Sequence, residues 1–122
     1  MRFIYKIISE LFLIISPLVI IYRIIRGKEN ISRFPERYGI KSKKRLDGKL
    51  IWFHCSSVGE LLSIVPIIEK LELNSSINQI LVTTTTLSSS KIFEKLNLKK
   101  SIHQFFPIDN KLIINKFINY WN

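Results

Sequence analysis

The stretch KLIWFHCSSVGE, residues 49–60, decides the fold. Its first part, Lys49 to Cys55, is a short apolar run rich in β-forming side chains, and such a run predicts a buried strand. Ser56 to Glu60 follow as a turn. A helix is expected from Leu61 to Leu71, where apolar residues recur at helical spacing although Pro66 interrupts the pattern. The stretch therefore predicts a strand, a turn and a helix, in that order.

The same order repeats toward the carboxyl terminus. Further strands are predicted at residues 79–85 and 103–107, and further helices at residues 88–98 and from Asp109 onward, with Asp109 as the N-cap. Strands that alternate with helices predict an α/β fold with a parallel sheet. The chain stops after a helix, where a further strand would normally follow. We therefore expect it to be the first part of a longer protein.

The amino-terminal residues are the most apolar of the chain. The apolar stretch runs from Phe3 to Ile25, and its uncharged core, Leu11 to Tyr22, is too short to cross ~30 Å of hydrocarbon. The full stretch is long enough but includes Lys6, which can snorkel to the interface, and Glu10, which is costly to insert. We predict a membrane-anchor helix over residues 1–26, as a marginal span or embedded in one leaflet. A buried helix of a soluble domain is the alternative.

The net charge of +10 belongs mainly to the same part of the chain. Residues 1–49 hold 12 of the 19 Lys and Arg residues but 4 of the 9 acidic residues. If the apolar helix spans a membrane, the basic residues after it place the remainder in the cytoplasm. Within residues 27–48, a cluster of four cations suits either anionic lipid headgroups or a solvated basic linker: Lys41, Lys43, Lys44 and Arg45.

Two polar segments fall where ligands bind open parallel sheets, beyond the carboxyl ends of the strands. In the first, Gly59 would let the backbone turn tightly and approach a ligand. Glu60 then lies near a helix start, where it can accept a proton from an alcohol or act only as an N-terminal helix acid. In the second, Thr83 to Thr86 offer hydroxyls to oxyanions or sugars, or form a polar strand end.

Other kinds of chemistry lack the residues they need. The single cysteine, Cys55, excludes an internal disulfide and a multi-cysteine zinc site. His54 and Cys55 would point to opposite faces of a strand, which argues against a nucleophilic pair. His103 is the only other histidine, and no phosphate-binding glycine motif is present. The sequence therefore predicts no metal and no cofactor.

Four segments, in order, carry a pattern known from one enzyme family. They are ERYG (residues 36–39), GKLIWFHCSSVGE (48–60), ILVTTTT (80–86) and HQFFPID (103–109). Together they resemble the amino-terminal domain of the 3-deoxy-D-manno-octulosonic acid (Kdo) transferases, which add Kdo to the lipid A precursor. The resemblance covers nearly the whole chain.

The resemblance implies a two-domain GT-B glycosyltransferase, of which residues 49–122 are a truncated α/β acceptor domain with a partial Rossmann-like sheet. This domain would receive the lipid A precursor at the cytoplasmic face of the inner membrane, next to anionic lipids. The carboxy-terminal domain would bind CMP-Kdo, without a metal. By position, Glu60 corresponds to the catalytic base, Ser57 and Gly59 shape its loop, and Thr83, Thr84, Thr85 and Thr86 line the site.

Two other functions remain open. Because the CMP-Kdo domain is missing, we expect the chain alone to be inactive, as a fragment, a split-gene product or the product of a decayed gene. A non-catalytic, membrane-anchored lipid-binding or scaffold remnant is therefore the alternative. A nucleic-acid-binding module ranks last, because the basic stretch has only Phe34 and Tyr38 as stacking aromatics and no reader motif.

Overall fold

The segment that decides the fold forms the predicted strand, turn and helix. β1 spans Leu50–Cys55 and α2 spans Val58–Glu72 in a computed structural model that describes all 122 residues. α2 begins before the predicted Leu61 and continues through Pro66. Glu60 therefore lies in the first turn of the helix rather than in a loop that precedes it.

The chain divides into two compact units, residues 42–106 and residues 1–41 with 107–122. These limits differ from the predicted boundaries after residues 26 and 48. The first unit contains β1, α2, β2 (Gln79–Thr84), α3 (Leu87–Lys95) and β3 (Ser101–Phe105). Its three strands are parallel in the order β1-β2-β3, which confirms the predicted α/β class. β3 begins and ends two residues earlier than the strand predicted at residues 103–107.

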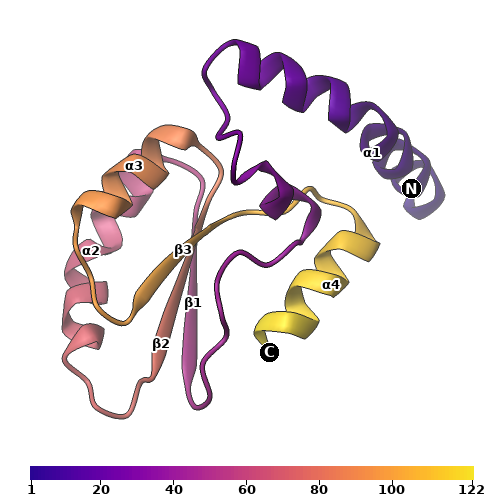
Figure 1. The fold of residues 1–122 in the computed structure, drawn as a ribbon. Coiled ribbons are helices and arrows are strands. Elements are labelled where there is room, and N and C mark those ends of the chain that lie inside the picture. The colour runs from indigo at the N-terminus through magenta and orange to yellow at the C-terminus, as the bar shows by residue number, and fades with distance from the viewer. The chain divides into compact units, whose positions relative to one another are not determined.

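One face of this sheet carries the hydrophobic core of residues 42–106. α2 and α3 lie on the same side of the strands (Figure 1), and fully buried side chains join them: Leu61, Ile68, Ile80 and Val82. Burial of each such side chain stabilises the fold by ~1.5–3 kcal/mol. This packing therefore holds α2 and α3 against β1 and β2. The carboxyl ends of the two strands lie side by side, because Cys55 pairs with Thr84 in the register.

The second unit contains α1 (Arg2–Ile25), the 3₁₀-helix η1 (Phe34–Tyr38) and α4 (Lys111–Trp121). The prediction of Asp109 as the N-cap of α4 is wrong: Asn110 takes that place, and its Oδ1 accepts from the N–H of Leu112 at 3.0 Å. The carboxylate of Asp109 instead accepts a hydrogen bond from Tyr5 of α1 at 2.7 Å. A tertiary contact therefore decides between two neighbouring residues that can both cap a helix.

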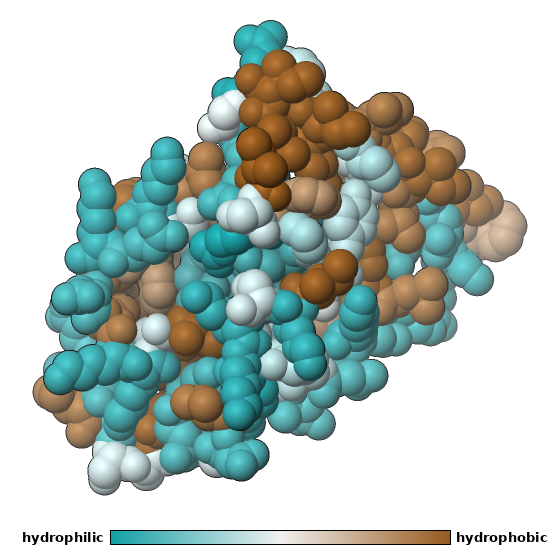
Figure 2. Space-filling view, in the orientation of Figure 1, coloured by the Kyte–Doolittle hydropathy of each residue, from teal (hydrophilic) through white to brown (hydrophobic).

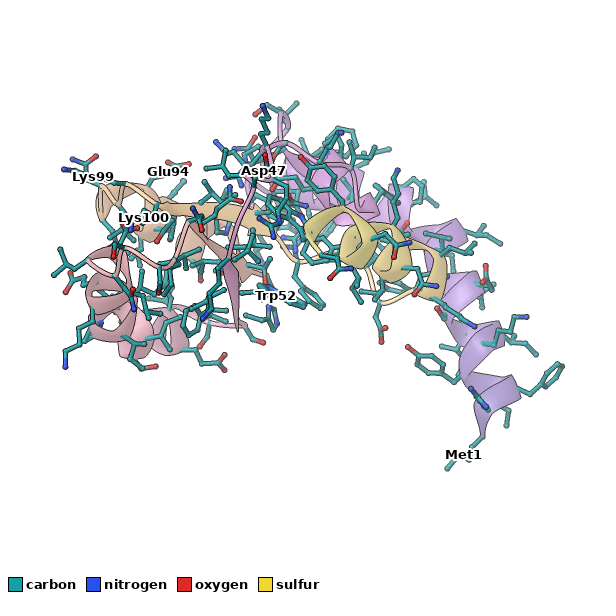
Figure 3. All side chains as sticks on the ribbon, turned by 90° about the horizontal axis from the view of Figure 1, so that it is seen from below. Met1, Asp47, Trp52, Glu94, Lys99 and Lys100 are labelled. Carbon is teal, nitrogen blue, oxygen red and sulfur yellow. The ribbon has the colours of Figure 1, made fainter.

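α1 is long and apolar enough to cross a membrane, by length and composition alone. Only 17% of its most apolar window is buried, so it does not have the character of a core helix. Phe3, Leu18 and Ile25 are each at least 69% exposed. Figure 2 shows the apolar surface over α1, and in Figure 3 the side chains near Met1 project outward.

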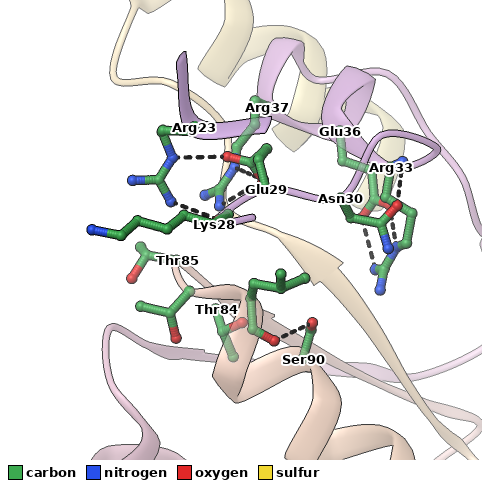
Figure 4. Close-up of polar contacts among 12 residues, drawn as sticks. Arg23, Lys28, Glu29, Asn30, Arg33, Glu36, Arg37, Thr84, Thr85 and Ser90 are labelled. Atoms are coloured by element: carbon green, nitrogen blue, oxygen red, sulfur yellow. Dashed lines mark hydrogen bonds and ion pairs between the residues drawn. The ribbon is translucent and has the colours of Figure 1, made fainter. Parts of the chain in front are cut away.

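Residues 27–48, predicted as a basic linker, contain η1 and buried ion pairs (Figure 4). Arg33 pairs with Glu36 at 2.7 Å, and Arg37 pairs with Glu29 at 3.3 Å. Burial lowers the pKa of Arg37, although the carboxylate of Glu29 opposes that shift. Part of the basic charge is therefore neutralised within the fold.

Candidate functional site

The two predicted polar segments meet at the carboxyl edge of the sheet. β1 is followed by Ser56 and β2 by Thr85, and the hydroxyl of Thr85 donates to the carbonyl of Ser56 at 2.6 Å. Thr86 is the N-cap of α3, as Ser57 is of α2. Two helices thus begin side by side at this edge, each directly after a strand, as an open parallel sheet provides.

Ser57 and Glu60 hold the start of α2 by a reciprocal pair of hydrogen bonds. The Ser57 hydroxyl accepts from the backbone N–H of Glu60 at 3.2 Å. In return, Oε2 of Glu60 accepts from the backbone N–H of Ser56 at 2.8 Å. This is close to a capping box, in which the two side chains satisfy N–H groups that the helix leaves open. The spacing S-x-x-E in the sequence is its signature.

The carboxylate of Glu60 is fixed yet exposed. It lies in the first turn of α2, near the positive end of the helix dipole. Burial raises the pKa of the Cys55 thiol, and the charge of Glu60 adds to that shift. An exposed carboxylate held by one oxygen can accept a proton from a hydroxyl that reaches the other oxygen.

Gly59 does not make the tight turn that the sequence suggested. It lies inside the first turn of α2 with an ordinary helical φ, and the positive-φ glycines are elsewhere. A Cβ atom at Gly59 would meet only the Ser57 hydroxyl, at 3.9 Å. The absence of a side chain there keeps the surface beside Glu60 open.

The four threonines divide into two pairs. Thr83 and Thr84 are fully buried, and their hydroxyls bond within the sheet: Thr83 to the indole N–H of Trp52 at 2.9 Å, and Thr84 to Nε2 of His103 at 2.7 Å. Thr85 and Thr86 are partly exposed. Only Thr85 and Thr86 therefore present side chains at the edge. Thr83 and Thr84 instead form hydrogen bonds inside the sheet.

His54 also lies at this edge, although the sequence did not predict it as a site residue. It is exposed, its Nδ1 lies 3.0 Å from the hydroxyl of Thr83, and its Nε2 lies 3.5 Å from the hydroxyl of Ser56. Its ring packs against Phe106 with centroids 4.2 Å apart. Cys55, 1% exposed, points to the opposite face as the strand period predicts. The period of two was the signal that could have placed His54 beside Ser56.

The charged side chains of this part of the chain do not cluster as metal ligands do. No group of three His, Cys, Asp or Glu side chains lies close enough together to hold a metal ion. His103, the second histidine, is buried and bonds to Thr84.

Comparison with known proteins identifies the family. The family model described as 3-deoxy-D-manno-octulosonic-acid transferase (kdotransferase) matches residues 32–122, which include the whole polar edge. The chain belongs to this family. The resemblance of the four sequence segments is thereby confirmed.

Relatives of this Kdo transferase family chain match almost all of it. A probable 3-deoxy-D-manno-octulosonic acid transferase, mitochondrial, of Arabidopsis thaliana is 38% identical over 98% of this chain and 27% of its own length. A 3-deoxy-D-manno-octulosonic acid transferase of Rickettsia bellii is 35% identical over 96% of this chain and 28% of its own length. The chain thus spans about a quarter of these relatives. No solved structure matches it.

Proposed function

We propose that this chain is the acceptor-side part of a glycosyltransferase that transfers Kdo from CMP-Kdo to a lipid A precursor. The observation that carries the proposal is the fixed, exposed carboxylate of Glu60 at the carboxyl edge of a parallel sheet, in a chain of the Kdo transferase family. The GT-B architecture and the donor come from the family resemblance.

In the proposed reaction, Glu60 is the general base. Its carboxylate takes the proton of an acceptor hydroxyl while that oxygen forms a bond to the anomeric carbon of Kdo. The bond from that carbon to the phosphate oxygen of CMP breaks, and CMP leaves with the electron pair. The Ser56 N–H holds one carboxylate oxygen at 2.8 Å, and the other can accept a proton from a hydroxyl that approaches this exposed side chain.

The other predicted site residues take supporting roles. Ser57 caps the helix that carries Glu60, and Gly59 leaves room for the acceptor. Thr85 and Thr86 line the neighbouring loop, whereas Thr83 and Thr84 hold the strands from below.

The lipid acceptor implies a membrane. α1 exposes large apolar side chains along its length, and we place the chain at the cytoplasmic face of the inner membrane, next to anionic lipids. The exposed lysines Lys41, Lys43 and Lys44 add cations close to that helix in sequence. A membrane-anchored lipid-binding protein without catalysis is the second candidate, favoured by the same exposed face.

The test distinguishes two roles of Glu60, as a general base and as part of the helix cap. A chimera in which residues 1–122 replace the matching segment of the Rickettsia bellii relative is assayed with CMP-Kdo and a lipid A precursor. Glu60→Gln keeps a side chain that completes a capping box but cannot act as a base, and Glu60→Ala removes both. Glu69→Gln, an exposed acid on the same helix, is the matched control.

We expect Glu60→Gln to lower the transfer rate by ~10²–10⁴-fold, as loss of a general base does, with Glu69→Gln unchanged. Full activity in Glu60→Gln with loss only in Glu60→Ala would show that the side chain is a helix cap. A chimera that binds lipid but never transfers Kdo, with Glu60 intact, would support the second candidate.

A further inference from the structure

α1 has two faces of opposite character. One face is a stripe at spacings of three and four residues, whose members are buried or partly buried: Ser9, Leu13, Ser16, Ile20 and Arg23. Three of these five side chains are polar. The rest of the surface carries the exposed apolar side chains, such as Ile14 at 75% and Leu18 at 69%. The polar side of this helix therefore faces its own unit, and the apolar side faces away.

The amino-terminal half of α1 is bonded to the loop before α4. The hydroxyl of Tyr5 donates to the carboxylate of Asp109 at 2.7 Å, and the hydroxyl of Ser9 donates to the carbonyl of Asp109 at 3.0 Å. Asn110 donates to the hydroxyl of Ser9 at 3.3 Å and to the carboxylate of Glu10 at 3.4 Å. Irregular backbone and a charged side chain thus lie against the amino-terminal half of α1.

The second half is bonded to the segment around η1. The hydroxyl of Ser16 lies 2.9 Å from that of Tyr38, and Arg23 pairs with Glu29 at 3.1 Å. From Tyr5 to Arg23 the helix rises roughly 27 Å at ~1.5 Å per residue. Polar groups of the same unit accompany α1 over nearly its full length.

These contacts are incompatible with a helix that crosses the bilayer in this conformation. A span of ~30 Å of hydrocarbon would carry the bonded loop inside with it. The backbone of residues 108–110 is not helical, and Asp109 carries an acidic side chain. Backbone and charges exposed to lipid have no water to satisfy them, so such segments do not occur there.

The basic residues of α1 suit the opposite arrangement. Arg2 and Lys6 lie near its beginning, and Arg26 and Lys28 directly follow its end. A pocket of about 520 Å³ near the beginning is lined by Arg2, Lys6 and Lys111, with Glu10 as the acid among them. Cations at both ends of an apolar face allow both ends to touch one anionic lipid surface, and the bonded loop before α4 selects this arrangement over a span.

We propose that α1 lies flat in one leaflet of an anionic membrane, with its polar stripe toward its own unit and both ends at the same water interface. The proposal rests on the membrane attachment in the proposed function and adds the orientation of the attached helix. The exposed apolar face of α1 contacts the acyl region of a phospholipid leaflet, and the cations at its ends contact the headgroup phosphates.

The test uses the full chain on sealed vesicles of phosphatidylethanolamine and phosphatidylglycerol. Arg2→Cys and Lys28→Cys form a matched pair, because each replaces one exposed cation near one end of α1. Cys55 is 1% exposed and gives little background. A maleimide that cannot cross membranes is added outside. A flat helix gives complete labelling of both variants without detergent.

Labelling of Arg2→Cys only after detergent, with Lys28→Cys labelled before it, would overturn the flat placement and leave the attachment intact. Failure of the chain to sediment with the vesicles would overturn the attachment itself. Kdo transfer by the chimera is measured separately, so each failure is distinguishable from that of the base assignment.

A second measurement does not depend on the ends. Nitroxide labels at Leu13→Cys and Ile14→Cys compare an inward with an outward position one residue apart. A flat helix places the label at Ile14 deep in the leaflet and the label at Leu13 shallow. The Ile14 label should then be more accessible to oxygen, and the Leu13 label more accessible to a water-soluble relaxant. Equal depth at the two positions, as neighbours in a spanning helix have, would contradict the proposal.

Discussion

Glu60 and Leu18 are both exposed, but for opposite physical reasons. Glu60 is an acid held by a backbone N–H at 2.8 Å, at a polar edge where the Thr85 hydroxyl donates to the carbonyl of Ser56. Leu18 is 69% exposed on a helix whose Ser16 hydroxyl is turned toward Tyr38 of its own unit. Hydration of a polar carboxyl side chain is favourable, whereas exposure of a leucine side chain to water is unfavourable. The sheet edge therefore exposes polar groups that water solvates, whereas α1 exposes an apolar surface of the kind that marks an interaction site.

The largest expected effect compares two phenylalanines. Phe105 is fully buried on β3, and Phe3 is 75% exposed on α1. We expect Phe105→Ala to lower the free energy of unfolding by ~3–5 kcal/mol, as loss of a buried ring does, and Phe3→Ala to leave it nearly unchanged. Denaturant unfolding followed by circular dichroism measures both.

The pair also has a second readout. Phe3→Ala should weaken binding to anionic vesicles, since its ring no longer enters the leaflet. Equal loss of stability in the two variants would show that α1 is part of a folded core and would end the contrast between the regions.

A smaller effect is expected from the buried threonine pair. Thr84→Val removes the hydroxyl that lies 2.7 Å from Nε2 of His103, both buried. Loss of one partner of a buried hydrogen bond costs ~1–3 kcal/mol. Thr85→Val, at a partly exposed position of the same run, is the control and should cost less. The reverse order, measured by thermal unfolding, would mean that the two pairs of threonines are assigned wrongly.

The cap of α2 gives the next effect. Ser57→Ala removes the hydroxyl that accepts from the N–H of Glu60, which costs ~1 kcal/mol for a helix N-cap. Ser63→Ala, on the exposed side of the same helix, is the control. Because the cap also orients Glu60, the Ser57 variant should slow transfer in the chimera. A slower rate in Ser63→Ala alone would contradict this link.

The strands β1 and β2 could be predicted because they are short apolar runs. The helices could be predicted because their apolar residues recur at helical spacing. The S-x-x-E spacing of Ser57 and Glu60 was also readable, since a capping box is local. The N-cap of α4 was not, because Asp109 is bound by Tyr5, which is remote in the chain. The pairing of Arg37 with Glu29, eight residues apart, was not predicted either, because it depends on how the chain folds between them.

The smallest expected effect is a pH dependence at Glu72. Burial alone would raise the pKa of this carboxyl, but hydrogen bonds from the hydroxyl of Ser101 and the N–H groups of Lys100 and Lys99 lower it overall. A lowered folded pKa stabilises the fold above the ordinary value of 4.5, and that stability is lost as the pH falls through the folded pKa. Glu72→Gln should therefore unfold with a flatter pH dependence below pH 4.5. An unchanged acid limb would contradict the assignment.

The most direct measurement takes the Glu60→Gln chimera and assays one preparation for both vesicle binding and Kdo transfer. If chemistry resides at the sheet edge and attachment resides in α1, binding is unchanged while the transfer rate falls by ~10²–10⁴-fold. An unchanged transfer rate, or a parallel loss of binding and transfer, would contradict the account.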